Sequence, residues 1–161
     1  MPTKTRPTPS TVTRFWSQVE RDPAREHLYV TLLGLRTYEA DGLHHRIEEG
    51  LSSQAVERLR QVLDVPDGEI ADLLHISPRT LARRKDSGRL QADESDRLVR
   101  LSRLAGLTLR LFEGDLRQAR SWLSAPHPAL GGASPLDFAT TDVGAREVEH
   151  LIGRLEHGIA V

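Results

Sequence analysis

The chain has 161 residues, of which 38% are hydrophobic and 28% are charged, and its formal net charge is −1. Such a composition is typical of a soluble globular protein with one ordinary domain, or with two small domains that share a core. There is no cysteine, which excludes disulfides, thiolate catalysis and the usual structural zinc sites. Neither a membrane span nor the apolar centre of a secretory signal is present, so we expect an intracellular, cytoplasmic protein without a membrane partner.

Helix-forming residues dominate the interior of the sequence, whereas runs of β-branched residues are absent, so we predict an all-α fold. The charges are unevenly distributed along the chain. Residues 77–110 hold nine Arg or Lys and four acids, whereas residues 134–161 hold five acids and two arginines. This separation predicts a polyanionic partner for one part of the chain and a different partner for the other.

The N-terminal residues 1–14 contain three prolines, five threonines and three basic residues but no acid. We predict a disordered or extended arm over residues 1–27 that includes a short helix. Such an arm could contact a phosphate backbone or the minor groove, although a loose tail is the simpler interpretation. Residues 15–38 are predicted to be helical, with a break at Pro23.

Regular helical signals begin after Gly42. Gly50 is expected to end a short helix, and Ser52 or Ser53 to cap the next one, whose apolar residues follow helical spacing. Residues 65–68 (Val-Pro-Asp-Gly) predict a turn. The apolar side of the short helix after that turn consists of Ile70, Ala71, Leu73 and Leu74.

Residues 77–89 form the most basic short helix in the sequence. Ser77 is a typical N-cap, Pro78 fits the first helical position, and Gly88 can adopt the left-handed conformation that ends a helix. Together with the apolar segment before it, residues 68–76, this stretch has the proportions of a helix-turn-helix. Its basic residues are Arg79, Arg83, Arg84, Lys85 and Arg89.

A helix-turn-helix requires particular residues at its packing positions. Ala71 lies where the first helix approaches the second, Ile76 fills the corner, and Leu81 anchors the second helix inward. His75 stands at the turn position often held by glycine, which predicts a strained or differently shaped turn. The candidates for contact with phosphates or guanine edges are Arg79, Thr80, Arg83, Lys85 and Arg89.

In the alternative interpretation, these arginines form salt bridges with Glu94 and Asp96 on the following helix. Arg84 is the strongest case, because it falls where the motif usually turns an apolar residue inward. We therefore expect Arg84 to be an internal tether.

The second half of the chain begins with a long helix that opens at the acids 93–96 and runs to about Phe112, with Gly106 as a mild defect. A short helix over 115–123, a structured Pro- and Gly-rich loop, and a helix start at Ser134 follow. The last helix, about 142–157, carries an amphipathic face that needs a partner inside or outside the molecule. That face consists of Val148, Leu151, Ile152, Leu155 and Ile159.

The seven histidines could suggest a metal site or acid–base chemistry. His44 with Glu48 and His45 with Glu49 have i, i+4 spacing, but a metal site needs at least three converging ligands. No nucleophile, phosphate-loop or dinucleotide signature is present. We therefore expect no cofactor, no metal and no catalytic activity.

Residues 79–101 (RTLARRKDSGRLQADESDRLVRL) resemble the helix-turn-helix region of the Xre/MbcA/ParS family of antitoxins. Residues 117–159 resemble the toxin-binding domain of the same family. The resemblance covers residues 28–161 and implies an Xre-like helix-turn-helix and dimerisation domain at 28–113 and a small helical toxin-binding domain at 114–161.

The resemblance implies a function as well as a fold. Antitoxins of this family belong to type II toxin–antitoxin systems and neutralise RES-domain toxins, which consume NAD, by covering or entering the toxin active site. The helix-turn-helix domain typically forms a homodimer and can bind operator DNA of its own operon. The implied toxin-binding residues are Trp122, Leu130, Gly131, Gly132, Arg146, Arg154, Glu156, His157 and Gly158. The alternative is a stand-alone transcription regulator whose C-terminal domain only dimerises.

Overall fold

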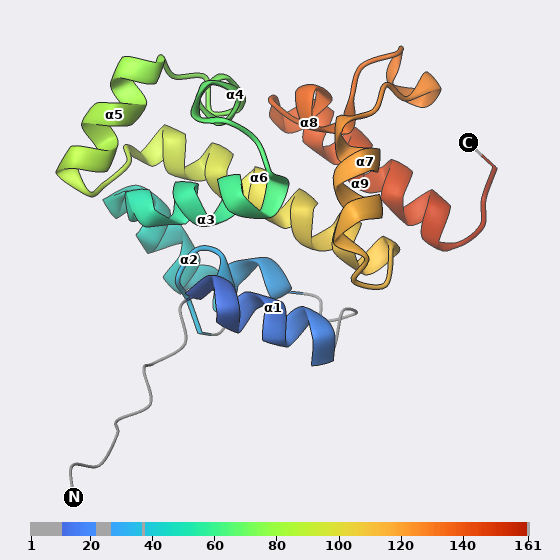
Figure 1. Ribbon diagram of the computed structural model, residues 1–161, viewed down its shortest axis with the longest axis horizontal. Helices are drawn as coiled ribbons and strands as arrows, with labels where there is room; N and C mark the ends of the chain where they lie inside the picture. The colour runs from blue at the N-terminus through green and yellow to red at the C-terminus, as the bar shows by residue number, and fades with distance from the viewer. Residues whose placement is uncertain (1–10, 22–26, 37, 161) are drawn as a thin grey trace, which may run out of the picture.

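The computed structural model describes residues 11–21, 27–36 and 38–160 of the chain. Across these residues the structure is all-α, as predicted, and has no strand. Its elements are α1 (Thr11–Arg21), η1 (Leu28–Thr31), α2 (Ala40–Glu49), α3 (Ser53–Leu63), α4 (Asp67–Leu73), α5 (Pro78–Ser87), α6 (Ala92–Leu111), α7 (Leu116–Ser124), η2 (Pro128–Leu130), α8 (Pro135–Phe138) and α9 (Asp142–Glu156). Helices α2–α5 lie around the first half of α6, and α7–α9 gather around its second half (Figure 1).

The N-terminal helix α1 corrects part of the expectation for the arm. Residues 11–14, predicted to be irregular, form the first turn of α1, which buries Phe15 and Val19 against the core. Residues 1–10 and Pro23, where we expected a break, lie outside the described residues.

Most helix ends in the region α2–α5 follow the predicted local signals. Gly50 ends α2 with a φ of 86°, and the Ser52 hydroxyl accepts a hydrogen bond from the Gln54 amide at 3.3 Å at the start of α3. The predicted turn at 65–68 is shorter than expected, because Asp67 and Gly68 already belong to the first turn of α4. There the acid of Asp67 lies at the positive end of the helix dipole.

Helix α6 is the central element of the core. The Glu94 carboxylate accepts a hydrogen bond from the Gln91 amide at 2.8 Å, and the Gln91 side chain accepts from the Glu94 amide, which completes a capping box. Gly106, expected to be only a defect, allows η1 to approach α6 closely. A Cβ at this position would lie 3.4 Å from the Cβ of Tyr29.

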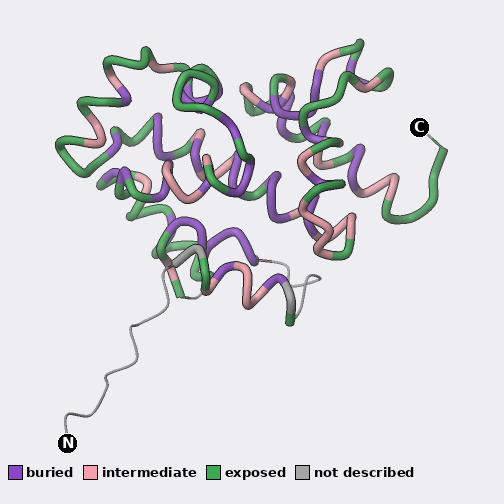
Figure 2. The backbone as a smooth tube through the Cα atoms, in the orientation of Figure 1, coloured by how far each residue is buried: buried purple, intermediate pink, exposed green. Residues whose placement is uncertain are grey.

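The amphipathic face of α9 finds its partner inside the molecule. Val148, Leu151 and Ile152 are buried where α9 packs against α6 (Figure 2). Ile159 was expected to continue this face, but the helix ends at Glu156 and Ile159 is 55% exposed. The residue therefore lies on the surface beyond the helix.

Helix α6 ends at Leu111, three residues before the predicted domain boundary at 114, and Glu113 and Gly114 both have positive φ. The buried apolar residues on either side nevertheless form one continuous cluster, because α9 returns along α6. The two regions therefore share a core. No helix within the described ranges is both long and apolar enough to cross a membrane.

Candidate functional site

Helices α4 and α5 form the predicted helix-turn-helix. The Ser77 hydroxyl accepts a hydrogen bond from the Thr80 amide at 3.1 Å, and Gly88 ends α5 with a φ of 79°. His75 takes the turn position with a φ of 56°, so the expectation of an unusual turn is confirmed. Leu81 and Ala71 are buried between the two helices, which fixes the orientation of α5.

Arg79 and Arg83 lie on the exposed surface of α5. Neither guanidinium contacts a carboxylate or a hydrogen-bond acceptor within the part of the chain that the structure describes. Thr80 is half-buried, and its hydroxyl oxygen accepts a hydrogen bond from Ser77 at 3.0 Å. The two arginines are therefore free to bind an anion, and the Thr80 hydroxyl can still donate a hydrogen bond.

Lys85 and Arg89 are held by other parts of the protein. The Lys85 ammonium lies 2.8 Å from a carboxylate oxygen of Asp67 and 3.8 Å from one of Glu57. The Arg89 guanidinium donates a hydrogen bond to the Glu49 carbonyl at 2.9 Å. Lys85 is thus partly neutralised, whereas Arg89 has no carboxylate partner within the described ranges.

Arg84 is the internal tether that we predicted. Its guanidinium binds the Glu94 carboxylate at 2.8 Å, and the two side chains are only 15% and 5% exposed. Burial raises the pKa of Glu94, but the hydrogen bonds from Arg84 and the Gln91 amide outweigh it, so this pKa lies below its usual value. The expected pairing of Asp96 with α5 is wrong, because Asp96 pairs with Arg100 one turn along α6.

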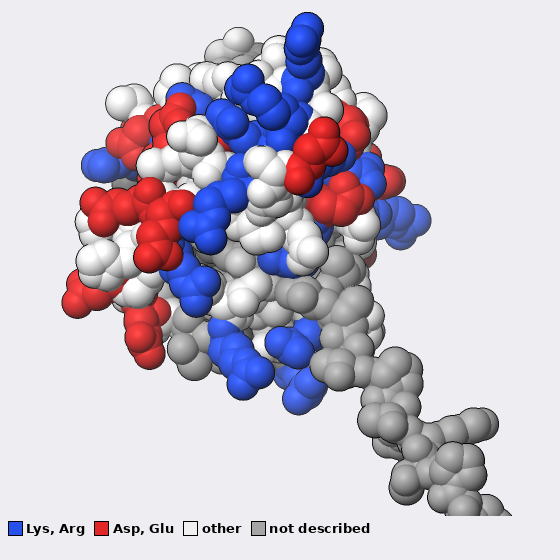
Figure 3. Space-filling view, turned by 90° about the vertical axis from the view of Figure 1, so that its left-hand side faces the viewer, with Lys and Arg blue, Asp and Glu red and all other residues white. Residues whose placement is uncertain are grey.

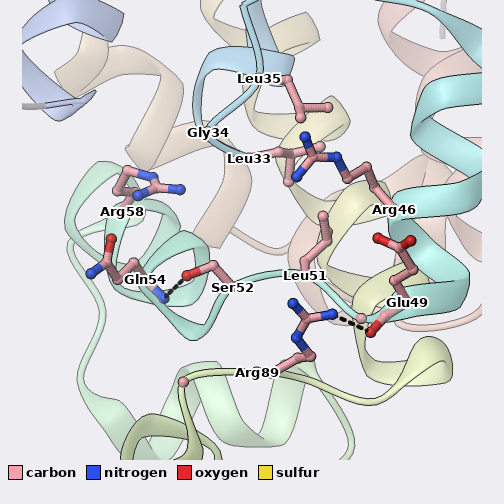
Figure 4. A pocket seen from close by; sticks show the side chains of 12 residues that line it. Leu33, Gly34, Leu35, Arg46, Glu49, Leu51, Ser52, Gln54, Arg58 and Arg89 are labelled. Carbon is pink, nitrogen blue, oxygen red and sulfur yellow. Dashed lines mark hydrogen bonds between the residues drawn. The ribbon is translucent and has the colours of Figure 1, made fainter.

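Sequence reasoning missed two further arginines, Arg46 and Arg58. They lie with Arg89 around a hollow of about 450 Å³ between α2, α3 and the α5–α6 connection (Figure 4). The two residues come from different helices, so no local spacing in the sequence signals that they converge. Only the folded arrangement brings them together.

The face that carries α5 has an uneven charge distribution. Seen from the left-hand side of Figure 1, basic side chains form a band down this face, with acidic side chains on both sides (Figure 3). Four exposed arginines in α2, in α5 and in the connection after α5 pair with no carboxylate of the described residues: Arg46, Arg79, Arg83 and Arg89. The band is a candidate surface for a polyanion.

The loop between α7 and α8 has the structure that its sequence suggested. Leu130 is buried, whereas Gly131 and Gly132 are exposed and have φ values of 65° and 85°. Trp122 is partly buried, and its ring centroid lies 6.1 Å from that of His127. Leu130 therefore anchors the loop in the core, and the two glycines form its exposed tip.

The remaining toxin-binding candidates lie on α9 and just beyond it. The Glu156 carboxylate binds Arg110 of α6 at 2.8 and 3.0 Å, and the His157 ring nitrogen Nδ1 lies 2.6 Å from the Gly153 carbonyl. Arg154 and Gly158 lie at the same end of the helix, where Gly158 has a φ of 66°. Arg146 is about two turns from Arg154 along the helix, and it pairs with Asp142 at 3.1 Å.

The histidines do not converge. His44 and His45 both lie near Glu48, at 3.5 and 3.6 Å, rather than pairing separately with Glu48 and Glu49. Within the described ranges, no group of three or more His, Asp or Glu side chains is placed to hold a metal ion.

Residues 42–103 match the antitoxin Xre-like helix-turn-helix domain, and residues 109–158 match the antitoxin Xre/MbcA/ParS C-terminal toxin-binding domain. The chain is 34% identical to a Yersinia enterocolitica protein named Antitoxin Xre, with 95% of each chain covered. It is 33% identical to an Antitoxin Xre of Photorhabdus laumondii, over 79% of this chain and 86% of the relative. A Sphingobium protein named Prs ADP-ribosylating antitoxin is 26% identical, over 70% of this chain and 76% of the relative.

Proposed function

Because the chain belongs to the Xre/MbcA/ParS family of antitoxins, we propose that it binds and blocks a RES-domain, NAD-consuming toxin and represses its own operon as a homodimer on operator DNA. In this function the protein has no catalytic role. The observation that carries the proposal is the order of the two matched domains, which place a helix-turn-helix and a toxin-binding region on opposite halves of α6.

The DNA-binding part of the proposal is supported by α5. Arg79 and Arg83 extend from an anchored helix, and neither has a partner among the residues that the structure describes. Arginine forms bidentate hydrogen bonds with guanine edges and with phosphates. A homodimer would present two such helices to two half-sites of an operator.

The toxin-binding part is supported by the surface of the C-terminal region. The loop tip at Gly131 and Gly132 and the segment after Glu156 are both exposed, while the helices that carry them are anchored in the core. The Sphingobium relative carries the words ADP-ribosylating in its name, which favours a toxin that uses NAD to modify a target.

Neutralisation can be tested by co-expression with the toxin encoded next to this gene. Deleting residues 146–161 would abolish it, but this deletion also removes Val148, Leu151 and Ile152 from the core. A chain that ends at Glu156 keeps the helix, so we expect it to fold yet to lose toxin binding and cell rescue. Full rescue by this shorter chain would exclude the C-terminal segment from the toxin interface.

Operator binding can be tested by replacing Arg79 and Arg83 with Ala in the full chain. We expect affinity to fall and its dependence on salt to flatten, because fewer counterions are released on binding. Unchanged affinity and slope in a mobility-shift assay would place the DNA contacts elsewhere. A stand-alone regulator, in contrast, would form a homodimer that binds DNA and would not co-purify with the toxin.

A further inference from the structure

The hollow between α2, α3 and the α5–α6 connection has the chemistry of an anion site. Among the described residues, its lining includes three arginines, Arg46, Arg58 and Arg89, and one carboxylate, that of Glu49. The three guanidinium groups face the hollow from three sides (Figure 4). Ser52 and Gln54 add a hydroxyl and an amide to the same lining.

Arg58 is held in place by the fold. Its Nε donates a hydrogen bond to the Leu32 carbonyl at 2.7 Å. Gly34 makes room for it, because a Cβ there would lie 2.9 Å from the Nη2 atom of Arg58. Burial lowers the pKa of Arg58, and no carboxylate in the described ranges compensates its charge. An anion in the hollow would supply the missing counter-charge.

The lack of a carboxylate partner for Arg58 among the described residues is not explained by a shortage of acids. Eight other arginines of the described chain lie within 3.9 Å of a carboxylate oxygen: Arg60, Arg84, Arg97, Arg100, Arg103, Arg110, Arg120 and Arg146. Arg46, Arg58 and Arg89 have no such contact among the described residues. Their charges are therefore available to a ligand.

The hollow is continuous with the surface of α5. A neighbouring depression of about 440 Å³ is lined by Arg83 and Ser87 of α5, and it shares Arg89 and Glu49 with the first hollow. Arg83 of α5 and Arg89 thus line one depression, and Arg89 lines the hollow as well. This continuity favours one extended ligand over an isolated small anion.

We propose that the hollow lined by Arg46, Arg58 and Arg89 binds a phosphate of the DNA backbone beside the segment that α5 reads. The proposal rests on the proposed DNA-binding function and extends the interface to α2 and α3. The first amides of α3 are already used, since the Ser53 amide donates to the Gly88 carbonyl at 3.0 Å. Side chains, and not the helix end, therefore supply the donors, and arginine forks suit a phosphate.

The test measures binding of the full chain to a fluorescein-labelled 30-base-pair duplex of mixed sequence by anisotropy, over a series of NaCl concentrations. The variant Arg46→Gln/Arg58→Gln should bind roughly three- to tenfold more weakly and lower the slope of log Kobs against log [NaCl] by about 0.9, the value for one lost phosphate contact. Arg117→Gln, which removes an exposed arginine of α7, is the matched control and should change neither quantity.

Arg46→Gln alone keeps the proposal testable if replacement of Arg58 lowers the melting temperature, because Arg46 is exposed. An unchanged slope in folded variants would overturn the proposal. A second arm titrates inorganic phosphate at constant ionic strength and follows the arginine Nε–H signals by NMR. Saturable shifts there, with an unchanged DNA slope, would assign the hollow to a free phosphate compound instead and also overturn the proposal.

The two variants distinguish an error in the proposed DNA-binding function from an error in the proposed phosphate site. If Arg79→Ala/Arg83→Ala left DNA affinity unchanged, α5 would not be the DNA-binding helix. If Arg79→Ala/Arg83→Ala changed the affinity and slope but Arg46→Gln/Arg58→Gln did not, the DNA-binding function would be supported and the phosphate site would be excluded.

Discussion

Apart from the Arg84–Glu94 pair, which tethers α5 to α6, the arginines around the two halves of α6 differ in their contacts. Around its first half, Arg79 and Arg83 extend from α5 and contact no carboxylate of the described chain. Around its second half, the arginines join α6 to α9: Arg103 lies 3.1 Å from Glu149, and Arg110 lies 2.8 Å from Glu156. Exposed arginines in one region are therefore available to an anion, whereas arginines in the other region tether two helices. The two groups of arginines differ in whether a carboxylate lies within ion-pair distance of the guanidinium.

The largest effect on stability is expected at the junction of α8 and α9, beside the second half of α6. A Cβ on Gly144 would collide with the carbonyl oxygen of Phe138, so Gly144→Ala should lower the free energy of unfolding by more than about 3 kcal/mol. Gly153 lies on the same helix with no atom near its would-be Cβ, so Gly153→Ala should raise stability by about 1 kcal/mol. Urea denaturation of both variants checks this, and equal effects would contradict the packing of α8 on α9.

The next largest effect on stability is expected from the ion pair of Arg84, in comparison with the exposed Arg83 on the same helix. Glu94→Gln keeps the capping-box geometry but removes the charge that faces Arg84, and it should lower stability by about 2 kcal/mol at neutral pH. Arg83→Gln, at the neighbouring exposed position, should change stability by less than about 0.5 kcal/mol. Equal losses of stability in Glu94→Gln and Arg83→Gln would show that the Arg84–Glu94 pair contributes no more to stability than the exposed Arg83.

The effect of Glu94 should depend on pH. The folded-state pKa of Glu94 lies below its usual value, so its contribution is complete above the pKa of the unfolded chain and is lost as pH falls through the folded pKa. The stability difference between the wild type and Glu94→Gln should therefore shrink between about pH 6 and about pH 3. Chemical denaturation across this range measures it, and a constant difference would mean that the charge of Glu94 does not act.

The smallest effect concerns the tethers between α6 and α9. A double-mutant cycle on Arg103 and Glu149, with both residues replaced by Ala, should give a coupling energy of about 0.5 kcal/mol that decreases in high salt, because Arg103 is half exposed. A coupling near zero at low salt would show that apolar packing alone joins the two helices.

Local signals in the sequence were sufficient to predict both ends of α5. Ser77, Pro78 and Gly88 each act through their own backbone neighbourhood, and the structure confirms all three positions. The inward role of Arg84 was also predictable, because it replaces an apolar residue at a packing position. These features depend on short stretches of chain.

The rest depends on contacts between distant parts of the chain. The hollow brings together Arg46 of α2, Arg58 of α3 and Arg89 after α5, and no spacing rule connects them. The binding of Lys85 by Asp67 was missed for the same reason. Ile159 fitted the helical period, yet the helix ends before it, so periodicity alone overextended the buried face.

The central claim is that DNA and toxin are bound by separate surfaces on one shared core. The most direct test is the Kd of the purified toxin for the Arg79→Ala/Arg83→Ala variant, compared with the wild type by isothermal titration calorimetry. Because distant sites act independently, the account predicts values equal within about twofold. A loss of about tenfold or more in a folded variant would contradict it, since the toxin would then depend on the basic face as well.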